Sequence, residues 1–61
     1  MEPIRDNGGN PIAFLEHQGH RVYLRDLGGN RLGWYDKDLD RTYDAAGNQV
    51  SYGDTLTRLI P

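Results

Sequence analysis

The chain contains no cysteine among its 61 residues, and this absence excludes a disulfide, a thiolate metal site and a cysteine nucleophile. Long apolar runs are also missing, and no segment approaches the roughly 20 residues that an apolar helix needs to span a bilayer. Met1 is followed by Glu2 and Pro3, not by a basic and then an apolar segment. We therefore expect no signal peptide, no membrane association and a cytoplasmic location.

Hydrophobic residues are scarce as well, at 36% of the chain. A chain of this length forms one domain, predicted here over residues 1–61, and buries only about 60% of its unfolded surface, so its own core is marginal. Basic residues are not in excess, because 7 Lys and Arg stand against 9 Asp and Glu, for a formal net charge of −2. This balance argues against a general attraction to nucleic acid or to an anionic membrane.

Residues that commonly carry catalysis are few. Ser51 is the one serine, and His17 and His20 flank the predicted turn at Gly19. Two imidazoles without a clear third ligand make a weak metal site, so we interpret both as solvated turn residues. The paired glycines at 8–9 and 28–29 lie in predicted hairpin turns that no helix follows, which excludes a phosphate-binding loop. We expect a protein that is not an enzyme and needs no cofactor.

The chain does contain a pattern that occurs three times, Asp-x-x-Gly-Asn followed by any residue, an aliphatic, a small residue and an aromatic. The copies span residues 4–14, 24–34 and 42–52. Asp accepts hydrogen bonds from the backbone of its own turn, and Gly takes a positive φ without a Cβ clash, so each copy predicts a β-hairpin. Three unrelated turns are the alternative, but they would not explain the matching columns.

The predicted fold is all-β, a meander of three repeated β-hairpins with Asp-x-x-Gly-Asn turns, plus a short C-terminal helix. The predicted strands are residues 3–5, 11–16, 21–25, 31–35, 41–43 and 49–52. Asp54 is a suitable N-cap for a helix over 55–60, where Leu56, Leu59 and Ile60 lie at i, i+3 and i+4 and form one apolar stripe.

Regular pairing around each turn predicts which residues face each other. The expected pairs are Leu24 with Leu32, Val22 with Trp34, Tyr23 with Gly33, Ile4 with Ile12 and Thr42 with Val50. In that register the tyrosine ring would cover the bare glycine backbone.

The face opposite the apolar one then becomes a candidate ligand site. Its predicted members are Arg5, Tyr23, Arg25, Arg31, Tyr35 and Tyr43. Arg25 would lie directly across from Arg31, which costs stability unless the charges are separated or neutralised. Local acidic side chains are one explanation, and an anionic or sugar-like ligand is the other.

The segment 36–40 places Asp36, Asp38 and Asp40 at alternate positions, like the start of a calcium loop. Arg41 stands where that loop needs Gly, and Gly47 stands where it needs a bidentate Glu. We therefore expect no tight calcium site here, and predict no metal site elsewhere in the chain.

Over nearly its full length, in residues 4–14, 24–35 and 42–60, the chain resembles the four-fold β-flower, a small bacterial and phage domain. Members of that family also string Arg-Asp-x-x-Gly-Asn hairpins together and end in a short Leu-rich segment. The resemblance implies a hairpin-repeat fold, but no activity, so it brings no catalytic residues. Residues 42–50 also resemble the Tyr-Asp repeat of Rhs-type proteins, which build large secreted β-shells. Only the third copy has Tyr-Asp, and the chain is too short for a shell.

The function favoured by these features is a structural or interaction module acting as a homo-oligomer, most simply a tetramer or dimer. Association would bury the stripe of Leu56, Leu59 and Ile60 or cap the unpaired strand edges. A monomer closed by a fourth unit around residues 17–20 is the alternative assembly. The alternative function is a small-ligand or carbohydrate-binding module that uses the Arg, Tyr and Trp side chains.

Overall fold

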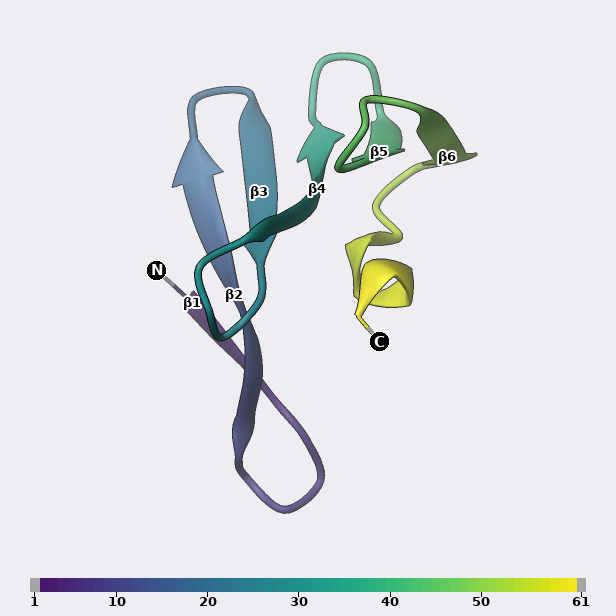
Figure 1. Ribbon diagram of the computed structural model, residues 1–61. Helices are drawn as coiled ribbons and strands as arrows, with labels where there is room; N and C mark the ends of the chain where they lie inside the picture. Colours follow the sequence, from purple (N-terminus) through teal and green to yellow (C-terminus); the bar gives the residue numbers. More distant parts are fainter. Residues whose placement is uncertain (1, 61) are drawn as a thin grey trace.

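The computed structural model describes residues 2–60, so Met1 and Pro61, the ends of the predicted domain, lie outside the described residues. The all-β prediction is confirmed, because six antiparallel strands form one sheet in the order β1-β2-β3-β4-β5-β6 (Figure 1). The elements are β1 (Glu2–Arg5), β2 (Pro11–Gln18), β3 (Arg21–Arg25), β4 (Arg31–Asp36), β5 (Arg41–Asp44), β6 (Gln49–Tyr52) and the 3-10 helix η1 (Leu56–Leu59). Within residues 2–60, β1 and β6 do not pair with each other, so the sheet of a single chain is open.

The three Asp-x-x-Gly-Asn turns share one set of hydrogen bonds. In the second copy the Asp26 amide donates to the Asn30 carbonyl at 2.9 Å, and Asp26 Oδ1 accepts from the Gly28 and Asn30 amides at 2.9 Å. Gly29 has φ of 87°, a conformation that favours glycine. The first and third copies repeat this arrangement, so the turn chemistry expected from the sequence is confirmed.

Each repeat hairpin also contains a β-bulge, which the regular pairing expected from the sequence does not include. In the second copy Arg25 pairs with Arg31 but Leu24 pairs with Gly33, so Leu32 is an extra residue on its strand. Ile12 and Val50 are the extra residues of the first and third copies. The aliphatic column of the repeat is therefore the bulge column.

The predicted pairs beyond the bulges were wrong for this reason. A bulge shifts the register by one residue, and a shift of one residue moves every later side chain to the other face. Trp34 consequently lies opposite Tyr23 and not Val22, and Tyr35 takes the place opposite Val22. In the same way Ile4 pairs with Ala13 and not with Ile12, and Leu24 pairs with Gly33 and not with Leu32. Thr42 pairs with Ser51 and not with Val50.

The core lies on the face that carries the small column. Its buried hydrophobic residues are Ala13, Val22, Leu24 and Leu56. η1 packs against β4 on this side, where a Cβ at Gly33 would overlap the Tyr43 carbonyl oxygen and Leu59 Cδ1. Gly33 is thus covered by Leu59, not by Tyr23 as the sequence suggested, and the close approach of η1 depends on the absent side chain.

The C-terminal helix is shorter than predicted and is anchored to β5. Thr55, not Asp54, precedes the first helical residue, while Asp54 Oδ1 accepts from the Leu56 amide at 3.3 Å. The buried Thr42 hydroxyl donates to the Gly53 carbonyl at 2.6 Å and accepts from the Thr55 amide at 3.1 Å. These bonds hold η1 over the sheet of its own chain.

The stripe predicted as an oligomer interface therefore packs inside the chain. Leu56 is 3% exposed in the core, and Leu59 and Ile60 are half-buried against it. An interface that used Leu56 would require η1 to leave the sheet.

Candidate functional site

The sheet face opposite η1 gathers the aromatic and arginine side chains, and we call it the arginine–aromatic face. By the observed register its charged and aromatic members are Arg5, Phe14, Glu16, Arg21, Tyr23, Arg25, Arg31, Trp34, Asp36, Arg41, Tyr43 and Tyr52. Among residues 2–60 no helix and no second sheet packs on this face, since η1 lies on the other side.

Three aromatic rings form a row across the middle of the face, one each from β3, β4 and β5. The Tyr23 and Trp34 centroids lie 6.2 Å apart with a tilt of 52°, and those of Trp34 and Tyr43 lie 5.4 Å apart at 21°, a stacked pair. The stacked pair sets one flat face of Trp34 against one flat face of Tyr43, so these two ring faces cover each other.

Guanidinium groups cover ring faces on this side of the sheet. Arg31 lies 4.0 Å from the Tyr23 centroid, Arg21 lies 5.3 Å from that of Trp34, and Arg41 lies 4.2 Å from that of Tyr52. These are cation–π distances, which stabilise a partly exposed face by charge and by coverage of the rings.

The predicted opposition of Arg25 and Arg31 is confirmed, and local contacts separate the two charges. Arg25 Nη2 and Nε lie 2.7 and 2.9 Å from Glu16 Oε1, while Arg31 turns onto the Tyr23 ring. The hydrogen bond from Arg25 is the main cause that holds the pKa of Glu16 below its ordinary value. Neutralisation by a local acidic side chain, one of the two explanations considered from the sequence, is therefore present.

The predicted ligand residues lie on this face with one exception. Tyr35 is on the core face, and its hydroxyl donates to Asp40 Oδ1 at 2.6 Å, which raises the pKa of the phenol. Trp34, which the sequence placed on the apolar face, instead lies at the centre of the arginine–aromatic face. Gly33 carried the missed signal, because a glycine inside a strand often marks a bulge.

Charge is segregated between this face and the rest of the molecule. Five arginines against two carboxylates give the arginine–aromatic face a formal charge of +3, whereas the whole chain carries −2. The remainder therefore carries −5, with exposed acidic side chains at Asp6, Asp38, Asp40 and Asp54 among others. A net charge for the whole chain conceals this separation.

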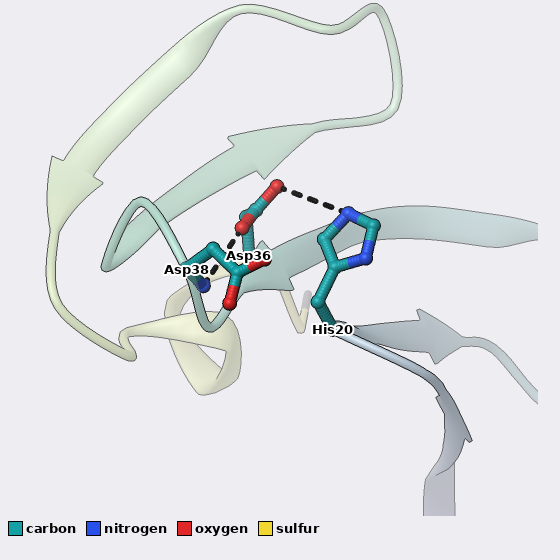
Figure 2. Close-up of side chains that lie close together, drawn as sticks. All are labelled: His20, Asp36 and Asp38. Atoms are coloured by element: carbon teal, nitrogen blue, oxygen red, sulfur yellow. Dashed lines mark hydrogen bonds and ion pairs between the residues drawn. The ribbon is translucent and has the colours of Figure 1, made fainter.

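A second cluster brings together His20, Asp36 and Asp38 at the end of the sheet where β4 enters the turn to β5 (Figure 2). Asp36 Oδ1 accepts from the backbone amides of Asp38 and Leu39 at 3.0 and 3.1 Å. The sequence suggested instead a triplet of Asp36, Asp38 and Asp40, but Asp40 turns to the Tyr35 hydroxyl. His20 and Asp36 lie at the open end of the β3–β4 hairpin, so the predicted hairpin already implied that they are close, but no spacing motif marks the three side chains as a site.

Comparison of the chain with protein-family models, curated proteins and solved structures gives no match. The resemblances to the four-fold β-flower and to Rhs-type repeats therefore stay predictions. Residues 2–60 contain no detectable ligand cavity. In the same part of the chain no helix has the length and apolar character needed to cross a membrane.

Proposed function

We propose that this chain is a non-catalytic interaction module that forms a homo-oligomer through its arginine–aromatic face. The observation that carries the proposal is an uncovered sheet face of charge +3, with a row of aromatic rings at its centre, on a molecule whose remaining residues carry −5. Aromatic and arginine residues are the types enriched at the centres of protein interfaces.

The edges of the sheet are less suited to assembly than this face. β1 carries Pro3, which lacks a backbone donor. β6 contains the bulge at Val50, which interrupts the regular row of backbone N–H and C=O groups at this edge of the sheet. Proline and bulges are devices by which natural proteins discourage edge-to-edge pairing. The Leu56 stripe is already used inside the chain, so the arginine–aromatic face is the surface that remains.

Charge also favours one geometry of contact between copies. Two arginine–aromatic faces placed against each other would bring +3 against +3, which is repulsive. A head-to-tail contact would instead set this face against the acidic surface of the next copy. Head-to-tail contacts close into a ring when the rotation between copies fits, so a closed ring such as a tetramer is favoured over a two-fold dimer.

Sedimentation equilibrium tests the proposal over a range of concentrations in low and high salt. We expect a mass that is a multiple of 6.9 kDa and that falls in high salt, because salt screens contacts between exposed charges. Arg31→Ser should weaken assembly, whereas Arg58→Ser, which removes an exposed arginine from η1, should not. A folded monomer under all conditions, or equal effects of the two variants, would contradict the proposal.

The alternative, a small anionic or sugar ligand on the same face, stays a prediction, as does the cytoplasmic location. The ring arrangement disfavours a sugar, because sugars stack on flat ring faces, and here Arg31, Arg21 and Arg41 occupy faces of the rings. Titration of phosphates, nucleotides and oligosaccharides, followed by Trp34 fluorescence, would detect such a ligand.

A further inference from the structure

His20, from the turn between β2 and β3, meets Asp36 and Asp38 at the end of β4 (Figure 2). One ligand atom from each of the three side chains lies within 4.8 Å of the other two. The Lys37 amide donates to the His20 carbonyl at 2.7 Å, which ties the two turns together. The cluster is therefore built on backbone that is held in place on both sides.

The Asp36 carboxylate is oriented before any ligand arrives. Its side chain is 6% exposed, and its Oδ1 is fixed by two backbone amides at 3.0 and 3.1 Å. The other oxygen, Oδ2, is turned toward His20 Nε2 at 3.7 Å and accepts no hydrogen bond from residues 2–60. Oδ2 is not among the buried atoms that lack a hydrogen-bond partner, so this oxygen is open to solvent and can accept a ligand from outside.

Arg21 is the other charged group beside Asp36, and it does not satisfy this oxygen. Its Nε lies 3.9 Å from Asp36 Oδ2, beyond hydrogen-bond length, and this buried nitrogen has no hydrogen-bond partner in the described part of the chain. The Arg21 guanidinium instead covers Trp34 and contacts the Tyr23 hydroxyl at 3.4 Å. Asp36 Oδ2 is thus left beside the His20 imidazole, without a hydrogen bond from Arg21.

We propose that His20, Asp36 and Asp38 bind a divalent transition-metal ion of the Zn²⁺ class. One imidazole nitrogen and two carboxylate oxygens suit a borderline-soft ion, and three protein ligands leave a position for water. Ligand atoms around Zn²⁺ lie about 3.5 Å apart when bond lengths are about 2.0–2.2 Å. His20 and Asp38 are exposed, so their side chains are free to rotate toward this spacing, while two backbone amides hold Asp36 in place. Ca²⁺, which takes about six to eight oxygen ligands, is not served by this set.

Isothermal titration of the full chain with ZnCl₂, together with CoCl₂ spectra, tests the site. We expect one ion per chain. His20→Ala should weaken binding by at least about tenfold, since even the loss of an outer-shell partner costs about 10–100-fold. His17→Ala is the matched control, because His17 is equally exposed but contacts Glu2 at 3.3 Å, away from the cluster, and it should leave binding unchanged.

Arg21 supplies a variant that should gain affinity. Its positive charge opposes the ion at Asp36, so Arg21→Gln should tighten Zn²⁺ binding several-fold. Circular dichroism checks that each variant folds. Absence of Zn²⁺ binding by the folded chain, or equal losses in His20→Ala and His17→Ala, would overturn the proposal. Calcium binding that Asp38→Asn removes and His20→Ala does not would overturn it too.

Discussion

The two faces of this sheet are made from the same repeat but differ in chemistry. The core face holds the small column with Val22 and Leu24, closed by Leu56 of η1. The arginine–aromatic face holds the aromatic column and five arginines, and no element in residues 2–60 closes it. Neighbouring columns point to opposite faces because side chains alternate along a strand, and the bulge at each aliphatic position decides which column meets the core. One extra residue per hairpin thus places the small column on the surface that holds the fold and the aromatic column on the surface open to a partner.

This difference predicts that substitutions on the core face change stability, while substitutions on the arginine–aromatic face change association. In a closely packed apolar core, the removal or addition of one methyl group lowers the free energy of unfolding. Stacked rings and guanidinium groups at a partly exposed surface contribute less to the fold, at about 0.5–1 kcal/mol for an exposed cation–π contact.

Leu56→Ala should have the largest effect on the fold. Leu56 is 3% exposed and joins η1 to the buried cluster, so its truncation leaves a cavity that costs about 2–5 kcal/mol of unfolding free energy. Thermal denaturation followed by circular dichroism measures the loss. Leu39→Ala is the control, since Leu39 is 56% exposed, and it should melt like the parent chain. Equal melting of the two variants would show that η1 does not hold the core.

Gly33→Ala should come next, at about 1–3 kcal/mol or more, because an added methyl group overpacks a close contact. Its Cβ would overlap the Tyr43 carbonyl oxygen and Leu59 Cδ1. Gly28→Ala adds the same methyl group where the nearest atoms, Asn30 Nδ2 and Asp26 Oδ1, lie at 3.4 Å. Urea denaturation should separate the two variants, and a Gly33→Ala midpoint as high as that of Gly28→Ala would mean that η1 is not seated on β4.

Acidification should lower the stability of the fold by a smaller amount, and part of this loss arises on the arginine–aromatic face. Hydrogen bonds from Arg25 lower the folded pKa of Glu16, and the Asn30 amide is the main cause that lowers the pKa of Asp26, from ordinary values of 4.5 and 3.8. A depressed folded pKa gives stability that is present above the unfolded value and is lost as pH falls through the folded value. Stability should therefore decline below about pH 4.5.

Glu16→Gln sharpens this prediction, because it removes the part of the acid dependence that arises on the arginine–aromatic face and leaves the part due to Asp26. Melting temperatures measured from neutral to acidic pH should fall less steeply for the variant. A slope identical to that of the parent chain would mean that the Glu16–Arg25 pair does not form in solution.

The fold was largely predictable, since turn chemistry is local. Asp26, Gly29 and Asn30 lie within five consecutive positions, and their hydrogen bonds follow from their residue types. The faces were not predictable to the same degree, because the regular pairing assumed around each turn omits the bulge, and one extra residue moves every later side chain of the strand to the other face. One missed residue was enough to exchange Trp34 and Tyr35 between the faces.

The site residues also fall into two groups, one whose contacts were predicted from the sequence and one whose contacts were missed. The opposition of Arg25 and Arg31 lies next to the turn, before the bulge, and was correctly predicted. The cluster of His20 with Asp36 and Asp38 was missed because its residues match no spacing motif, although His20 and Asp36 both lie at the open end of the predicted β3–β4 hairpin. The alternate aspartates of the sequence group Asp40, not His20, with Asp36 and Asp38, and no tight calcium site was predicted from them. Asp40 has φ of 53° and its carboxylate turns to Tyr35.

The claim that the arginine–aromatic face meets a second copy is tested most directly by the fluorescence of Trp34, the one tryptophan of the chain. Trp34 lies half-buried at the centre of that face. As concentration rises in low salt, its emission should shift to the blue and its quenching by acrylamide should fall, and high salt should reverse both changes. Emission and quenching that stay constant while the sedimenting mass increases would contradict this account, because the copies would then meet at another surface.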